Sequence, residues 1–243
     1  MRFSGGGVEL LLDPADGGRI TSLVAHGREW LAPSSPRVPN ESFVDAGTGG
    51  WDECAPTVRA GILPDGTVLR DHGDAWRSPW EEGIRVLLPS VGVTLERTLS
   101  ATPTGVRLDY SATSRSDVPL LWCAHPLFAA PPGTRIVAGG ELTAEYPAIE
   151  RIEWPASIDD VSGAIKAFAD VQEASIRHAD GVELRMRWSL PHAGFYWDSS
   201  EFTSTPVMAI EPTTGRSDSA VDVLDALPVV RADEPLRWWI ELR

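Results

Sequence analysis

The sequence has 243 residues, of which 42% are hydrophobic and 23% are charged, a balance that is typical of a folded globular chain and excludes a disordered or fibrous one. The 35 acidic residues outnumber the 21 basic ones and give a net charge of −14, which repels phosphate groups, so we expect no nucleic-acid partner and no anionic membrane surface. No apolar run approaches the ~20 residues of a membrane helix, and the N-terminal residues lack the apolar core of a signal peptide, so we expect a cytoplasmic protein with no membrane partner.

Counts of single residue types add further limits. Cys54 and Cys123 are too few for a disulfide framework, and we expect both to be reduced and small hydrophobic residues. The ten tryptophans suit either strand cores or stacking on the apolar faces of sugar rings, and both readings stay open. Lys166 is the only lysine. The length, with no internal repeat or change of composition, indicates a single domain over residues 1–243.

The chain opens with short strands joined by turns. Residues 8–12 and 19–25 are strand-like runs, and the segment 13–18 between them, Asp-Pro-Ala-Asp-Gly-Gly, has the composition of a turn. We therefore expect an antiparallel meander at the N-terminus.

Residues 46–80 form a long segment without strand periodicity, rich in Gly, Pro, Asp, His and Trp. Long irregular segments in compact domains are often functional, although this one would also serve merely to cap one end of a sandwich. It contains Gly49-Gly-Trp-Asp-Glu-Cys-Ala-Pro-Thr57 and Leu69-Arg-Asp-His-Gly-Asp-Ala-Trp76. Its acidic, Cys and His residues match no metal-ligand spacing, so we expect no metal.

Period-two alternation of apolar and polar residues follows. It is clear over 93–96 and 106–111 and again over 182–188 and 236–242, which predicts strands with one buried face. Helix is expected only as a turn or two within 158–171, and Gly163 weakens even that. The predicted fold is all-β, a large antiparallel two-sheet sandwich.

Two apolar runs each carry one residue suited to proton transfer. The run 120–128 leads into His125-Pro126, and the run starting at Pro206 carries Glu211 to a Pro-Thr-Thr-Gly turn. Rigid strands hold such side chains in place, so His125 and Glu211 are candidates for a general acid and a general base. Taken singly, each residue also has a structural interpretation. His125 would be a core histidine with satisfied hydrogen bonds, and Glu211 would be a carboxylate that accepts hydrogen bonds from the turn amides.

Several segments together resemble the galactose mutarotase-like family, which comprises aldose 1-epimerases and their sugar-phosphate relatives. The matching pieces occur in the family's order over nearly the whole chain: Gly17-Gly-Arg-Ile-Thr-Ser-Leu23, Gly27-Arg-Glu-Trp-Leu31, Gly50-Trp-Asp-Glu-Cys54, Asp71-His-Gly73 with Trp76, Ala124-His-Pro-Leu-Phe128, Trp197, and Ile210-Glu-Pro-Thr-Thr-Gly215 with Asp218-Ser219.

The resemblance implies a β-supersandwich with a sugar-binding cleft on its concave face. In it, His125 corresponds to the family's general acid, Glu211 to its general base and His72 to its second, sugar-binding histidine. The cleft arginine is best matched by Arg59, with Arg77 as the alternative.

Other substrate contacts are assigned more loosely. The family's sugar-binding aspartate has three possible counterparts, Asp52, Asp74 and Asp198, and we expect Asp52 at the site. Trp76 and Trp197 are expected to stack on a sugar, as Trp51 would in a binding protein.

The resemblance implies an aldose 1-epimerase that opens the ring of a hexose or hexose phosphate by acid and base catalysis, with no cofactor. One alternative is a carbohydrate-binding sandwich without catalysis, which would keep the tryptophans but need no acid and base pair. The other is a lyase or glycosidase, which would require two carboxylates or a tyrosine base. The expected partner is a small sugar or sugar phosphate, and the chain is expected to be a monomer or homodimer.

Overall fold

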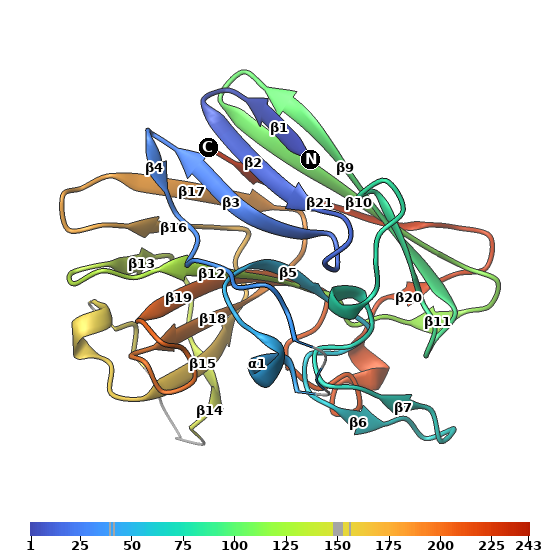
Figure 1. Ribbon diagram of the computed structural model, residues 1–243. Helices are drawn as coiled ribbons and strands as arrows, with labels where there is room; N and C mark the ends of the chain where they lie inside the picture. The colour runs from blue at the N-terminus through green and yellow to red at the C-terminus, as the bar shows by residue number, and fades with distance from the viewer. Residues whose placement is uncertain (39, 41, 148–152, 156) are drawn as a thin grey trace.

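The computed structural model describes residues 1–243 except residues 39, 41, 148–152 and 156, and most of its strands form two antiparallel sheets (Figure 1). The larger sheet has the strand order β1-β2-β3-β5-β12-β19-β18-β15-β14, and β4 pairs with β3. Its strands are β1 (Arg2–Gly5), β2 (Val8–Asp13), β3 (Arg19–Ala25), β4 (Arg28–Glu29), β5 (Gly50–Cys54), β12 (Cys123–Ala129), β14 (Thr143–Tyr146), β15 (Ala164–Ala169), β18 (His192–Asp198) and β19 (Val207–Thr213).

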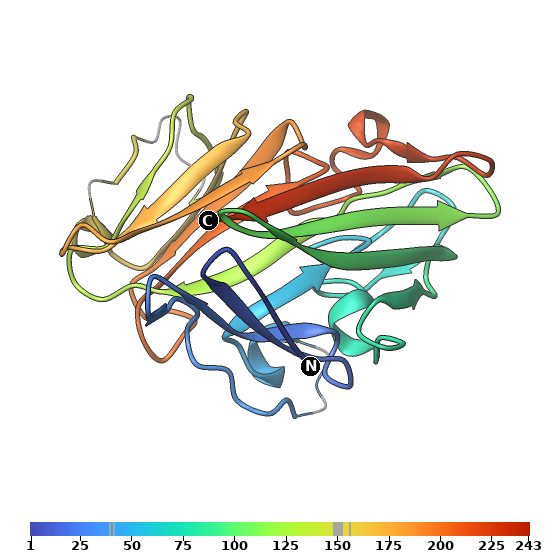
Figure 2. The ribbon, with the colours of Figure 1, turned by 90° about the horizontal axis from the view of Figure 1, so that it is seen from above.

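The smaller sheet has the order β13-β16-β17-β21-β10-β9-β8. Its strands are β8 (Arg85–Leu88), β9 (Val93–Thr102), β10 (Gly105–Ser114), β13 (Arg135–Val137), β16 (Glu173–Arg177), β17 (Glu183–Trp188) and β21 (Leu236–Leu242). Seen from above, β9, β10 and β21 run side by side (Figure 2).

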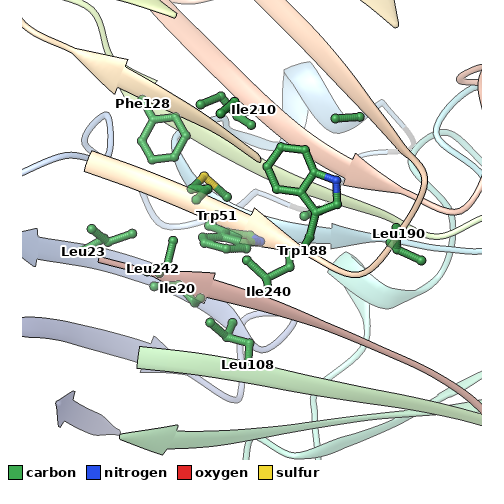
Figure 3. Packing of buried hydrophobic residues seen from close by; sticks show 14 of the residues in the cluster. Ile20, Leu23, Trp51, Leu108, Phe128, Trp188, Leu190, Ile210, Ile240 and Leu242 are labelled. Carbon is green, nitrogen blue, oxygen red and sulfur yellow. The ribbon is translucent and has the colours of Figure 1, made fainter. Parts of the chain in front are cut away.

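The main hydrophobic core lies between the two sheets, as Figure 3 shows. Trp51 and Ile210 project into it from the larger sheet, and Trp188, Ile240 and Leu242 project from the smaller one. All five side chains are at most 2% exposed. Burying an apolar side chain of this size contributes about 1.5–3 kcal/mol, so alternating apolar residues on both inner faces hold the sheets together.

The remaining elements are short. They are the helix α1 (Phe43–Ala46), the 3₁₀ helices η1 (Ala75–Arg77), η2 (Ile158–Asp160) and η3 (Leu224–Ala226), and two strand pairs, β6 (Gly61–Ile62) with β7 (Val68–Leu69) and β11 (Val118–Pro119) with β20 (Val229–Val230). None of the described helices is long and apolar enough to cross a membrane.

The predicted antiparallel sandwich is confirmed, including the N-terminal meander of β2 and β3 and the alternating strands β9, β10, β17 and β21. The segment 158–171, where a turn or two of helix was predicted, is mostly strand. Only the single turn η2 forms, Gly163 follows with a φ of 77°, and Ala164–Ala169 becomes strand β15 between β14 and β18. Pairing on both sides gives this segment more hydrogen bonds than an isolated helix turn would.

Strands β12 and β19 each divide their residues between two faces of the larger sheet. On β12, Ala124 and Phe128 belong to the main core, whereas Leu127 belongs to a separate cluster on the other face. On β19, Ile210 enters the core and Ala209 joins the same outer cluster. By alternation, the odd-numbered side chains of both strands lie on this outer face, where the candidate site is found.

Candidate active site

A cavity of about 370 Å³ opens on the outer face of the larger sheet. Its floor is made by strands β12, β15, β18 and β19, and its walls come from α1 and from the loops around residues 48, 58, 71, 202 and 218. The lining residues are Phe43, Val44, Thr48, Val58, Arg59, Asp71, His72, His125, Leu127, Glu145, Tyr146, Lys166, Tyr196, Phe202, Thr203, Glu211 and Asp218.

The structure brings His125 and Glu211 together on the floor of this cavity. Strands β12 and β19 pair Cys123 with Thr213 and Phe128 with Met208, and the same register carried between these pairs sets His125 opposite Glu211. The His125 Nε2 atom lies 3.9 Å from Glu211 Oε1. The sequence had suggested that both residues lie at strand ends. In the structure they lie inside their strands.

Burial sets the charge of His125. The residue is 8% exposed, and its ring packs edge-on against the rings of Phe43 and His72 at 5.1 and 5.2 Å. Burial lowers the pKa of the His125 imidazole well below its usual value, and the nearby His72 and Lys166 lower it further. The imidazole is therefore neutral at pH 7 in the unliganded protein.

Glu211 is fully buried, and its two carboxylate oxygens have different surroundings. Oε2 accepts a hydrogen bond from the Lys166 ammonium and lies 3.5 Å from Cys123 Sγ. Oε1 has no hydrogen-bond partner among the described residues and faces His125. One oxygen is thus held by the protein and the other is available to a ligand.

Lys166 reaches this site from strand β15. Its Nζ also lies 3.4 Å from Asp218 Oδ1. Burial alone would lower the pKa of Lys166, but the carboxylates of Asp218 and Glu211 raise it well above its usual value. Burial raises the pKa of Asp218, and the Lys166 charge opposes that rise. Lys166 is therefore an ammonium group among carboxylates.

His72 enters from the loop that follows β7. Its Nδ1 lies 2.8 Å from Asp71 Oδ1, and its ring stacks on Phe43 at 4.1 Å. Asp71 also accepts a hydrogen bond of 2.6 Å from the Phe43 amide, which ties the start of α1 to this loop. The structure thus places His72 beside His125 in the cavity wall.

Arg59 lies at the cavity mouth, where its side chain is 54% exposed. Its guanidinium pairs with Asp222 and lies 3.7 Å from Glu145 Oε1. Arg77 instead lies over the Trp76 ring, 4.6 Å from its centroid, and lines a neighbouring cavity. Of the two arginines, only Arg59 lines the candidate site.

Two other predicted contacts are wrong because their side chains are occupied elsewhere. Asp52 lies opposite His125 on β5, but it is 1% exposed and pairs with Arg37 and Arg19, so it does not reach the cavity. Trp76 is 2% exposed, packs on Phe43 and donates its indole N–H to the Asp71 carbonyl. It supports the wall without lining it.

The prediction for Trp197 is also wrong, because this side chain is fully buried in the core on the opposite face of β18. Trp51 is likewise a core residue. The remaining aspartate candidates are engaged as well: Asp198 accepts hydrogen bonds from the amides of Glu201 and Phe202, and Asp74 accepts them from Ser90.

Sequence reasoning missed several lining residues, among them Lys166, Asp218, Tyr146, Tyr196 and Phe202. A signal existed for Lys166, since it is the only lysine and sits in an otherwise apolar run. The mistaken helix hid it. Asp218 was quoted in the resemblance but given no role. Tyr146 and Phe202 lie in segments without a periodic pattern.

No protein-family model matches this chain, and no curated protein matches it either. Solved structures do match: the Slr1438 protein of Synechocystis sp. PCC 6803 superposes with a TM-score of 0.76 at 15% identity, covering 100% of this chain and 95% of that one.

Two further solved structures that match the chain have names that refer to galactose mutarotase. A galactose mutarotase-like protein from Lactobacillus casei ATCC 334 matches with a TM-score of 0.71 at 13% identity, covering 100% of this chain and 99% of that one. A galactose mutarotase related enzyme from Lactobacillus acidophilus matches with a TM-score of 0.65 at 13% identity, covering 100% and 97%. Over its whole length, the chain therefore has the galactose mutarotase-like fold.

Proposed function

We propose that the protein is an aldose 1-epimerase, which interconverts the α and β anomers of a sugar. The observation that carries this proposal is the pair formed by His125 Nε2 and Glu211 Oε1, 3.9 Å apart on the floor of a cavity of about 370 Å³. Cavities of this size are ordinary for small-molecule sites.

The chemistry of a cyclic sugar matches this pair. The anomeric hydroxyl and the ring oxygen are bonded to the same carbon, so an acid and a base that act on them must lie within a few ångströms of each other. Glu211 Oε1 accepts the proton of the anomeric hydroxyl while His125 delivers a proton to the ring oxygen, and the ring opens. Rotation about the first carbon–carbon bond and reversal of both transfers close the ring as the other anomer.

The binding residues are part of the same proposal. His72 and Arg59 line the cavity from its wall and mouth and contact sugar hydroxyls. The rings of Tyr146, Tyr196 and Phe202 take the stacking role that the sequence assigned to tryptophans.

The test is anomer exchange by NMR with a panel of free aldoses. We expect the parent chain to accelerate exchange, and Glu211→Gln and His125→Asn each to lower the rate by about 10²–10⁴-fold, the usual contribution of one general acid or base. Glu173→Gln and His192→Asn, both outside the cavity, are matched controls and should keep the parent rate.

Binding of a sugar without any accelerated exchange would contradict the enzyme and favour the carbohydrate-binding alternative. Parent rates in either cavity variant would remove that residue from the mechanism.

A further inference from the structure

The only lysine of the chain is buried in the floor of the candidate active site. Lysine is almost never buried unless it is paired, and Lys166 is paired twice, with Glu211 Oε2 and with Asp218 Oδ1. The proposed proton transfers need neither contact. The position of Lys166 therefore requires its own explanation.

The path of the Lys166 side chain is built into the sheet. Lys166 lies on β15 and Glu211 on β19, and strand β18 runs between them. Gly194 of β18 lies opposite Glu211, and a methyl group there would come within 3.1 Å of Lys166 Cε and 3.2 Å of Glu211 Oε2. Glycine weakens a strand interior and often marks a close approach. Here it leaves the space in which the lysine crosses the strand.

We propose that Lys166, which crosses over Gly194, is a positioning residue that holds Glu211 ionised with Oε1 turned toward the substrate. Its role as an aid to catalysis depends on the proposed function. Because Nζ occupies Oε2, only Oε1 is left to accept a proton. A carboxylate held by one oxygen is also restricted in rotation, which keeps the free oxygen beside His125.

Several titratable groups face Glu211 and contribute to the pH dependence of the proposed reaction. They are Cys123 and His125 from β12, Lys166 from β15, Tyr196 from β18, Tyr146 from β14, Asp218 from the segment after β19, and His72 with Asp71 from the loop after β7. Lys166 is the buried cation of this group. Its removal leaves Glu211 without a compensating charge and removes a charge that lowers the pKa of His125.

The first test is the pH profile of kcat/KM for anomer exchange in Lys166→Met. We expect both limbs of the profile to move to higher pH: the acid limb by about 1–3 pH units, since the opposite charge beside the Glu211 carboxylate is lost, and the basic limb because a like charge near His125 is lost. At the parent's optimum, the rate should fall by about 10²-fold because the carboxylate is no longer fixed. Lys166→Arg keeps the cation and should keep the acid limb of the parent. A purely structural role would lower the rate without moving the limbs.

Glycine variants form a matched pair. Gly194→Ala is expected to push Lys166 and Glu211 a few tenths of an ångström apart and to shift the profile in the same direction as Lys166→Met, by a smaller amount. Gly139→Ala places the same methyl group in open space and should behave as the parent. Parent profiles in both Lys166→Met and Gly194→Ala would overturn the inference.

The second test does not depend on activity. Protein labelled with ¹⁵N at the lysine Nζ yields a single side-chain signal, because the chain has one lysine. We expect an ammonium signal protected from exchange with water at neutral pH, and a clear change of its shift in Glu211→Gln. A signal that exchanges freely and ignores Glu211→Gln would overturn the inference. Absence of anomer exchange with every aldose would overturn the proposed function alone, and the lysine signal would then decide whether Lys166 holds Glu211.

Discussion

His125 illustrates how one residue's environment sets the working range of the proposed enzyme. Protonating a ring oxygen requires the imidazolium form, but burial, with His72 and Lys166, lowers the pKa of His125 well below its usual value. The competent form is therefore a minor population at neutral pH. Glu211, in contrast, accepts a hydrogen bond from the Lys166 ammonium group.

The expected outcome is a rate that falls with rising pH. Above the pKa of His125 the protonated fraction drops tenfold per pH unit, so kcat/KM for anomer exchange should decrease steadily from about pH 6 to pH 8. Exchange NMR in buffers of constant ionic strength measures this directly. A profile that is flat across the interval would show that the imidazolium of His125 is not the acid.

At the scale of elements, strand β5 is joined to the smaller sheet by a buried polar network. Glu53 Oε1 accepts hydrogen bonds from Arg97 Nη1 of β9 at 2.7 Å and from the Tyr110 hydroxyl of β10 at 2.9 Å. All three side chains are at most 2% exposed. Burial raises the pKa of Glu53 to about 7, although Arg97 and the hydrogen bonds oppose the rise. β5 also carries Asp52 beside the candidate site, so the network fixes the sheet under the cavity.

This network should make stability depend on pH. Glu53 titrates near 4.5 when exposed and near 7 when folded, so the folded chain binds the proton more tightly and loses stability as pH rises between these values. Glu53→Gln resembles the neutral form of Glu53 and so does not lose stability over this range. The free energy of unfolding of the variant minus that of the parent should therefore increase from pH 5 to pH 8 by up to about 3 kcal/mol. Urea denaturation at each pH measures the difference, with exposed Glu173→Gln as control; a pH-independent difference would contradict the assigned pKa.

Some strands could be predicted from patterns in the sequence and others could not. Strands with clear alternation, such as β9 and β10, were predicted because one face meets the core and the other meets water. Strand β15 was missed because Ala164–Ala169 is buried on both faces and so has no alternation, a pattern that does not separate strand from helix. His125 and Glu211, which were chosen from local sequence, lie together in one cavity, whereas Trp197 was misassigned because sequence does not tell which sheet face a residue occupies.

At the scale of the whole molecule, the distribution of charge affects which substrates the cavity can bind. The chain carries −14, and the described cavity lining contains the carboxyl groups of Asp71, Glu145, Glu211 and Asp218 against the cations Lys166 and Arg59. Arg59 is itself engaged by Asp222. A phosphate group needs cationic partners that are available, and this lining offers carboxylates that repel it.

Phosphorylated sugars should therefore be poor substrates. We expect kcat/KM for glucose 6-phosphate to lie at least about tenfold below that for glucose, since one added like charge at short range costs on the order of 1–2 kcal/mol in a partly exposed site. Glu145→Gln and added salt should both narrow the gap. Equal or faster exchange of the phosphate ester would contradict this assignment of substrate class.

The burial of the only lysine has a chemical consequence for the proposed ring-opening reaction. An open-chain aldose carries an aldehyde, and aldehydes condense with neutral amines to form imines. Lys166 remains an ammonium between Glu211 and Asp218 and has no lone pair to offer. Under the proposed function, the only lysine therefore offers no neutral amine to the aldehyde formed in the cavity, and no imine with Lys166 is expected.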